Sequence, residues 1–327
     1  MSTVPPTRWL RRAGIGLALV LAIALVLPYL LPIQAGTAAT ELADPDGRFV
    51  TVNGLRTYVI DAGPEDGLPV LLVHGLGGST FSWRENIAAL ADAGYRTIAL
   101  DLPGFGLTDK PLAYDYSHPS QADFIAALLD AVGIEQAVLV GHSMGGSIIG
   151  HVAVRHPERV SGLVFVDGAV NTEASRPTAL SGAVALPPIS RWVQVLAPLL
   201  VSRERFVGLL ASAYGPAYTL TPEVEAGYAR VLQTQDWPNG LVGLIRDAQE
   251  NALSLADLAA VDVPTLIVWG ESDTWVPLSR GEALLGRLAG AQWRSYPLVG
   301  HLPMEELPAD FNRDLIAFLD TIRETSE

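Results

Sequence analysis

The chain has 327 residues, a length that suits one large α/β domain with an insertion or two ordinary domains. Hydrophobic residues make up 49% of it and charged residues 17%, a balance that excludes global disorder. The formal net charge of −14 argues against nucleic acid as a partner, and the lack of cysteine excludes disulfides, thiolate catalysis and cysteine-ligated zinc or iron–sulfur clusters.

An uncharged apolar run, residues 13–33, follows a basic segment, residues 1–12. As a helix this run would span about 30 Å, close to the hydrocarbon thickness of a bilayer, and the positive-inside bias predicts a cytoplasmic N-terminus with the rest of the chain outside. Two interpretations stay open. One is an uncleaved transmembrane signal anchor, which the length of the run favours; the other is a signal peptide cleaved among the small residues 35–39, which would leave a secreted or periplasmic protein. Pro28 and Pro32 argue against a long straight helix.

Residues 34–48 are small, polar and acidic, as is typical of a linker. Residues 49–52 and 55–60 flank Asn53-Gly54, a pair that favours a tight β-hairpin. Strand and helix patterns then alternate, which predicts a mostly parallel sheet covered by helices on both faces. The expected strands are 70–73, 97–100, 137–140, 160–166, 265–269 and 293–298, and the expected helices are 83–93, 121–132, 281–288 and 309–322.

Residues 169–262 interrupt this alternation with prolines and aromatic residues among helix-like apolar spacings. A stretch of this length is not a loop of a compact domain, so we expect a helical cap inserted after the sixth strand. The remainder, residues 49–168 and 263–327, forms the predicted α/β core. The cap would lie over the carboxyl-terminal edge of the sheet, where open α/β sheets bind ligands.

Ser143 lies at the centre of a Gly-x-Ser-x-Gly pentad between a predicted strand and a helix-compatible run. A serine at so sharp a turn is held in a strained backbone conformation, and Gly141 and Gly145 provide the small neighbours that the turn requires. The strand–turn–helix context therefore favours a nucleophilic serine over an incidental one.

A serine hydroxyl needs a base within hydrogen-bond reach, and the base needs an orienting carboxylate. His301 follows the last predicted strand and is the strongest candidate base, because His142 beside the serine is expected to point elsewhere. Asp273, in the loop after the preceding strand, is the favoured carboxylate, with Asp167 in reserve and Glu271 third. If Asp167 is not the acid, we expect it to cap a helix or to lie in a solvated turn.

An oxyanion formed at such a serine needs two backbone N–H donors. Met144 directly follows Ser143 at a helix N-terminus and supplies the first. Leu76 is the favoured second donor, because Gly75 and Gly77 let the backbone turn its amide inward, and Gly75 itself stays an alternative.

Five short motifs follow one another between residues 49 and 321: His-Gly-Leu-Gly-Gly at 74–78, Asp-Leu-Pro-Gly-Phe-Gly at 101–106, Gly-His-Ser-Met-Gly-Gly at 141–146, Gly-Glu-Ser-Asp at 270–273 and Gly-His-Leu-Pro at 300–303. By these motifs the chain resembles the α/β-hydrolase superfamily, of the serine-nucleophile type with a helical cap. The resemblance implies a triad of Ser143, Asp273 and His301, an eight-stranded mostly parallel sheet, and neither a cofactor nor a metal.

The residues favour a carboxylesterase- or lipase-like enzyme that cleaves hydrophobic small-molecule or lipid esters through an acyl-enzyme. This expectation depends on the apolar cap and on a membrane contact through the N-terminal segment. A carbon–carbon bond hydrolase is an alternative, although such relatives often carry Asn at the place of His142. A cofactor-free haloperoxidase or perhydrolase of the same fold, and a non-catalytic module that holds a ligand under the cap, are further alternatives. No protein partner is indicated.

Overall fold

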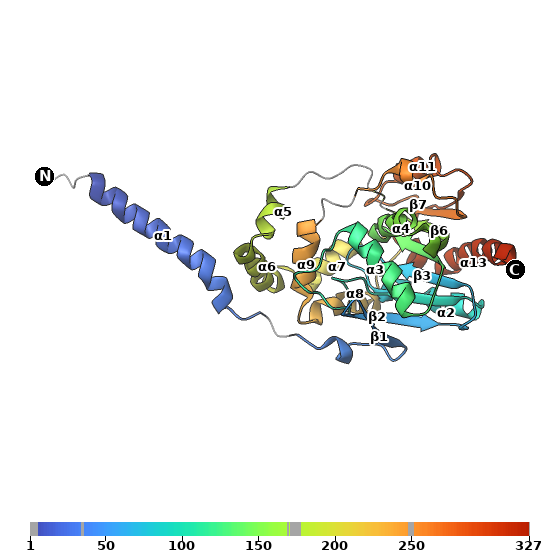
Figure 1. Cartoon of the computed structure of the whole chain (residues 1–327), viewed down its shortest axis with the longest axis horizontal. Helices are drawn as coiled ribbons and strands as arrows, with labels where there is room; N and C mark the ends of the chain where they lie inside the picture. Colours follow the sequence, from blue (N-terminus) through green and yellow to red (C-terminus); the bar gives the residue numbers. More distant parts are fainter. Residues whose placement is uncertain (1–5, 34–35, 169, 171–177, 248–251, 327) are drawn as a thin grey trace.

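The computed structural model describes residues 6–33, 36–168, 170, 178–247 and 252–326. Within them, eight strands form one sheet in the order β1-β2-β4-β3-β5-β6-β7-β8. Figure 1 shows the whole chain, with α1 projecting from the body that holds the sheet. The strands are β1 (Gly47–Val52), β2 (Leu55–Ala62), β3 (Pro69–Val73), β4 (Arg96–Leu100), β5 (Ala137–His142), β6 (Val160–Val166), β7 (Thr265–Gly270) and β8 (Gln292–Tyr296). β2 pairs antiparallel with both β1 and β4, and every other pair is parallel. This is the mostly parallel eight-stranded sheet that the sequence predicts, with the expected hairpin closed by Asn53 and Gly54 at positive φ.

Helices cover both faces of the sheet, because successive strand residues point to opposite sides. Leu71 and Val73 belong to one buried cluster with residues of α3, α4 and α11. Val70 and Leu72 belong to a second cluster with residues of α2 and α13. These helices are α2 (Ile87–Asp92), α3 (His118–Ala131), α4 (Met144–Arg155), α11 (Leu278–Leu285) and α13 (Pro308–Ser326).

The helix predicted over residues 83–93 is only partly present. A 3-10 turn covers Thr80–Trp83, and α2 begins at Ile87. Between them the Asn86 side chain is buried and donates through Nδ2 to the Met304 carbonyl at 3.1 Å and to Asn312 Oδ1 at 2.7 Å. These partners lie more than 200 residues away in sequence, so the local apolar pattern gave no sign of the break.

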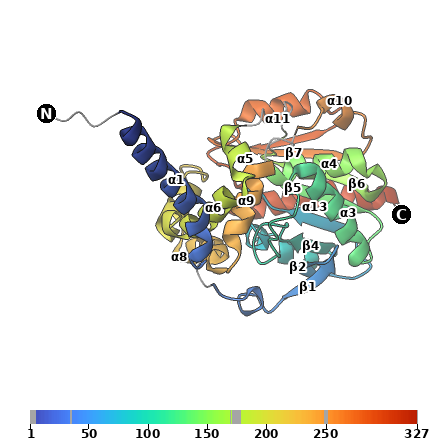
Figure 2. The same ribbon diagram turned by 60° about the vertical axis from the view of Figure 1, so that its left-hand side comes forward.

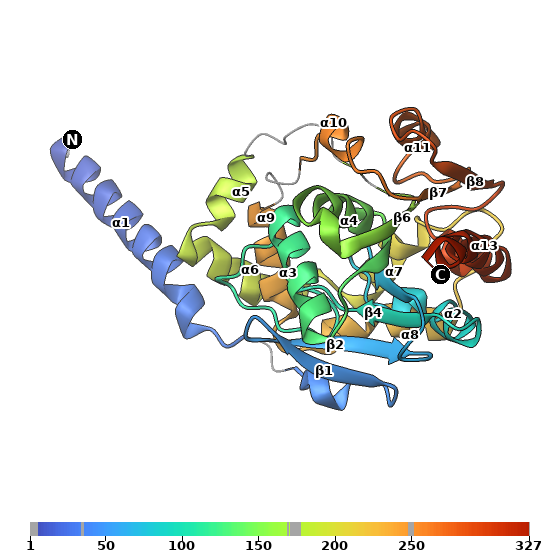
Figure 3. The same ribbon diagram turned by 45° about the vertical axis from the view of Figure 1, so that its right-hand side comes forward.

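A helical insertion separates β6 from β7, where the sequence predicts a cap (Figure 3). Its helices are α5 (Ala179–Val184), α6 (Pro187–Leu200), α7 (Arg203–Ala211), α8 (Pro222–Ala229), α9 (Trp237–Asp247) and α10 (Leu255–Leu258). Residues 169, 171–177 and 248–251 of the expected cap lie outside the described residues. The insertion is tied to the core, because the His301 N–H donates to the Ala213 carbonyl at 2.7 Å and the Gly215 N–H donates to Glu306 Oε2 at 2.9 Å.

The N-terminal helix α1 (Pro6–Leu30) begins before the predicted run and ends before Pro32, two residues beyond Pro28. Among the described residues one helical stretch, Trp9–Leu30, is long and apolar enough to cross a membrane, with a mean hydropathy of 2.4 and little burial. It projects from the globular body and meets it at α6 (Figure 2).

Two side chains of α6 hold the C-terminal part of α1. Trp192 Nε1 donates to the Ala24 carbonyl at 2.8 Å, and Arg191 donates to the carbonyls of Pro28 at 3.0 Å and Leu31 at 2.9 Å. The carbonyls of a last helical turn have no partner within the helix, so Arg191 satisfies groups that α1 leaves open.

The segment that follows α1 also joins the insertion. Residues 34 and 35, the start of the predicted linker and cleavage region, lie outside the described residues. Beyond them the Thr37 N–H donates to the Gln233 carbonyl at 2.8 Å, and Thr37 forms a parallel bridge with Thr234. A side-chain carbon at Gly36 would come within 2.4 Å of the Gln235 nitrogen, so the two segments are in close contact.

Candidate active site

Ser143 sits between the end of β5 and the start of α4 with φ 51° and ψ −118°, a backbone conformation that L-residues rarely adopt. A side-chain carbon at Gly145 would lie 2.4 Å from the Val73 carbonyl oxygen, and one at Gly141 would lie 2.5 Å from the Gly145 carbonyl oxygen. Only glycine fits at these two positions, which is the steric reason for the pentad. The turn has the strained geometry that the sequence predicts for a nucleophile.

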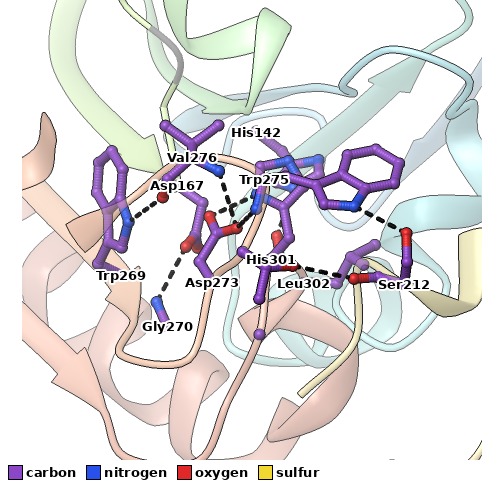
Figure 4. A network of polar contacts seen from close by, with 12 residues as sticks. His142, Asp167, Ser212, Trp269, Gly270, Asp273, Trp275, Val276, His301 and Leu302 are labelled. Carbon is purple, nitrogen blue, oxygen red and sulfur yellow. Dashed lines mark hydrogen bonds and ion pairs between the residues drawn. The ribbon is translucent and has the colours of Figure 1, made fainter.

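His301 and Asp273 lie in the loops after β8 and β7, and the fold brings them into contact. His301 Nδ1 donates to Asp273 Oδ2 at 2.7 Å, with both side chains almost fully buried (Figure 4). The other carboxylate oxygen, Asp273 Oδ1, accepts the backbone N–H groups of Trp275 at 2.7 Å and Val276 at 3.0 Å. Three donors therefore hold this carboxylate in place, and its contact with Nδ1 orients the imidazole so that Nε2 is free to accept.

His142 contacts the same histidine from the other side. Its Nε2–H donates to the His301 carbonyl at 2.7 Å, and the two rings have centroids 4.7 Å apart. Burial, and then the neighbouring His301, hold the pKa of His142 well below its usual value, so this ring is neutral. The sequence predicts that His142 is not the base, and it gives no sign that this side chain bonds to the His301 loop.

The burial of the Asp167 side chain differs most from what the sequence predicts. The sequence predicts a helix cap or a solvated turn for it unless it is the acid; instead its side chain is fully buried, at a positive φ of 44°, directly after β6. Asp167 Oδ1 accepts the Gly270 N–H at 3.0 Å, and Asp167 Oδ2 has no hydrogen-bond partner among the described residues. Burial, and then the charge of Asp273, raise the pKa of Asp167 well above its usual value. The raised pKa favours the protonated form of Asp167, and a protonated Asp167 can donate to Asp273.

Asp167, Asp273 and His301 offer ligand atoms within 4.8 Å of one another, a spacing that a metal ion also requires. The fit to a metal is poor, because His301 Nδ1 already donates to Asp273 and a metal ligand must present a bare nitrogen. A proton shared between the two carboxyl groups suits this donor set better. Glu271, the third candidate acid, is exposed and accepts from Ser295 Oγ at 2.8 Å.

The predicted oxyanion donors lie on two segments beside Ser143, namely the start of α4 and the loop after β3. Met144 is the first residue of α4, so its N–H has no acceptor within the helix. Leu76 follows Gly75, at which a side-chain carbon would lie 2.9 Å from the Ser143 Cβ. Within the described part of the chain, the Leu76 N–H donates no hydrogen bond to protein. Both amides are therefore available to a ligand.

A cavity of about 500 Å³ lies between the helical insertion and these loops. That volume is in the range of small-molecule sites. Core residues on its wall include Leu76, His142 and His301; residues from the insertion include Phe206, Leu210 and Trp237. The wall is predominantly apolar, and the described residues that line it include no lysine or arginine. Of the predicted site residues, His301 and Leu76 line this cavity. Ser143 is not among the described lining residues, although a side-chain carbon at the lining residue Gly75 would lie 2.9 Å from its Cβ.

Comparisons with known proteins agree with this architecture. The family model described as "alpha/beta hydrolase fold" matches residues 69–308. An uncharacterised hydrolase of Bacillus subtilis is 31% identical over 283 residues, covering 85% of this chain and 99% of the relative. A 2-hydroxy-6-oxo-6-phenylhexa-2,4-dienoate hydrolase of Burkholderia cepacia is 31% identical over 295 residues, covering 86% of this chain and 99% of the relative.

Among solved structures, a bacterial membrane phospholipase A described as a virulence factor is 26% identical with a TM-score of 0.68. The similarity covers 97% of this chain and 99% of the phospholipase. It leaves out about ten of 327 residues and so extends into α1, which has 25 residues. The match of the family model to most of the chain, together with relatives above 30% identity over nearly their whole length, places this protein in the α/β-hydrolase family.

Proposed function

We propose that this protein is a membrane-anchored serine hydrolase that cleaves esters of hydrophobic acids, with membrane lipid esters as its substrate class. The observation that carries the proposal is the apolar cavity whose wall includes His301, itself bonded to the buried Asp273. The helical insertion acts as the cap of this cavity.

The reaction begins when His301 Nε2 takes the proton of the Ser143 hydroxyl and the serine oxygen attacks the ester carbonyl carbon. Asp273 holds the imidazole in the required tautomer and stabilises the imidazolium that forms. The amides of Leu76 and Met144 donate to the oxyanion, each worth about 3 kcal/mol in the barrier. His301 then protonates the leaving alcohol, and in the second half it deprotonates a water that releases the acid from Ser143.

The lining of the cavity favours a neutral, apolar substrate. A dienoate such as the one named for the Burkholderia relative carries a carboxylate, which calls for a cation in the pocket. No lysine or arginine is present among the described residues that line this cavity. The long apolar helix α1 and the similarity to a membrane phospholipase over nearly the whole chain support a lipid ester as the substrate.

The test of the proposal is Ser143→Ala in the full-length protein, assayed in detergent with p-nitrophenyl octanoate. We expect turnover to fall by about 10⁴-fold or more, because the nucleophile is lost. Ser279→Ala is the matched control, because Ser279 is exposed on α11. Retained turnover in a Ser143→Ala protein with native circular dichroism contradicts the proposal.

A carbon–carbon bond hydrolase is the second candidate, and it is favoured by the relative from Burkholderia cepacia. The same catalytic serine and histidine would then cleave a 2-hydroxy-6-oxo-dienoate. The two candidates are separated by measuring kcat/KM for that dienoate and for a diacylglycerol or phospholipid ester with one enzyme preparation. A value at least 100-fold higher for the dienoate would replace the ester proposal.

A further inference from the structure

Several leucine side chains in the described part of the helical insertion are exposed, and four of them lie on α6 and α7. Leu196, Leu199 and Leu200 on α6 are 39%, 73% and 58% exposed, and Leu209 on α7 is 61% exposed. We refer to these four residues as the leucine face. Exposed apolar side chains gathered in one region of a soluble surface mark an interaction site.

The leucine face begins where α6 contacts α1. Trp192, which donates to the Ala24 carbonyl, precedes Leu196 by four residues and Leu199 by seven. Residues at these spacings share one side of a helix. These spacings place one apolar stripe along α6, from its contact with α1 to its end. Figure 2 shows α6 beside α1.

The depth of this contact follows from the geometry of α1. Arg12 is the last charged residue before the apolar run, and Ala24 lies twelve residues further on, or roughly 18 Å along the helix axis. Pro28, whose carbonyl Arg191 binds, lies roughly 24 Å from Arg12. The hydrocarbon core of a bilayer is about 30 Å thick, so a spanning α1 places both contacts on the outer side of its midplane.

We infer that the leucine face is immersed in the outer leaflet of the bilayer that α1 spans, and that lipid substrate passes over it into the cavity. The inference rests on the proposed membrane anchoring and names where the substrate enters. The occupant of the face is the acyl-chain region of the membrane. A second copy of the chain is the competing occupant.

The cavity opens toward this face. Val201, directly after α6, lines the cavity, as do Leu209 and Leu210 of α7. Leu209 therefore belongs both to the leucine face and to the cavity wall. On the core side the cavity wall includes Leu76, which is 61% exposed and follows Gly75, the residue packed against Ser143. An acyl chain that leaves the bilayer at the end of α6 thus remains in contact with apolar side chains until it reaches His301.

The lack of cysteine in the chain makes the inference directly measurable, since one introduced cysteine is the only labelling site. Leu199→Cys, labelled with bimane in the full-length protein, is reconstituted in phosphatidylcholine–phosphatidylglycerol vesicles with or without lipids brominated in the acyl chain. We expect at least a twofold loss of fluorescence with the brominated lipids. Glu135→Cys is the control. Glu135 is exposed just before β5, at the amino-terminal ends of the strands and away from the cavity, so the bimane fluorescence there should not fall.

Two outcomes overturn the inference. One is equal fluorescence at position 199 with and without bromine in vesicles that retain the protein. The other is efficient disulfide formation between Leu199→Cys copies under mild oxidation, since it would show that a second copy covers the face.

An activity measurement separates membrane docking from catalysis. In Leu196→Gln/Leu199→Gln neither changed residue lines the cavity. We expect hydrolysis of soluble p-nitrophenyl butyrate to stay within about twofold of wild type, and hydrolysis of phospholipid in vesicles to fall at least tenfold. Equal loss on both substrates contradicts the inference. If wild type hydrolyses neither substrate, the ester proposal fails, while the bimane experiment still decides the docking.

Discussion

Asp167→Asn tests whether the buried Asp167 carboxyl group beside Asp273 and His301 is protonated. Asparagine has nearly the same shape as a neutral aspartic acid, can accept the Gly270 N–H through its oxygen and can donate to Asp273 through its nitrogen. If Asp167 is neutral in the folded protein, the substitution changes little at the site. We expect kcat for a p-nitrophenyl ester at pH 7 to stay within about threefold of wild type.

The same substitution changes how the free energy of unfolding depends on pH. In the unfolded chain Asp167 ionises above its ordinary pKa of 3.8, whereas in the folded protein its pKa is raised. Between these two pKa values the folded state binds one more proton than the unfolded state, so wild type loses up to about 1.4 kcal/mol of unfolding free energy per pH unit as the pH rises. Asparagine does not titrate, so the unfolding free energy of the variant lacks this pH dependence. The contributions of the other titrating groups are the same in both proteins and cancel in the difference between them.

The assay is urea unfolding of both proteins in detergent micelles at pH 5, 6 and 7, followed by tryptophan fluorescence. We expect the unfolding free energy of Asp167→Asn minus that of wild type to increase with pH, by up to about 2.7 kcal/mol over the two pH units. A difference that is constant with pH, or a variant with the 10⁴-fold loss expected of a missing catalytic carboxylate, refutes a neutral Asp167.

Three further predictions concern other parts of the site. Asp273→Asn should lower kcat for a p-nitrophenyl ester by about 10⁴-fold while KM changes little, because the imidazole loses its orienting carboxylate; an unchanged kcat would remove Asp273 from the triad. Glu305→Gln should lower the unfolding free energy by about 2 kcal/mol, since Arg84 Nη2, 2.8 Å from the buried carboxylate, loses its ionic partner; an unchanged urea midpoint would contradict this. Gly145→Ala should abolish folding of soluble protein, because its side-chain carbon would lie 2.4 Å from the Val73 carbonyl oxygen; a native circular dichroism spectrum would count against the steric argument.

Features of the site that depend on local sequence could be predicted. The elbow at Ser143 is fixed by its own glycines and by the strand and helix beside it, all within a few residues. Asp273 and His301 lie in the loops that follow β7 and β8, and parallel neighbouring strands bring their carboxyl-terminal loops together. The proximity of the two loops therefore follows from the pairing of these strands. Their catalytic roles, and those of Leu76 and Met144, stay predictions until the variants are measured.

Features that depend on distant partners could not be predicted. The burial of Asp167 depends on Gly270 and Asp273, more than 100 residues further along the chain. The contact of His142 with the His301 carbonyl spans 159 residues, and no periodicity in the sequence encodes it. The turn at Ser143 and the loops of Asp273 and His301 could thus be predicted from local sequence, whereas the contacts of Asp167 and His142 are known only from the fold.

The bridge between Thr37 and Thr234 bears on how the protein matures. A signal peptidase needs its target segment extended and unpaired, yet residues 36 and 37 are held against the insertion once the chain has folded. If the N-terminal segment is a signal peptide, a cut among residues 35–39 must therefore come before residues 36 and 37 pair with the insertion. If it is a signal anchor, the same pairing keeps the segment after α1 out of a peptidase's reach.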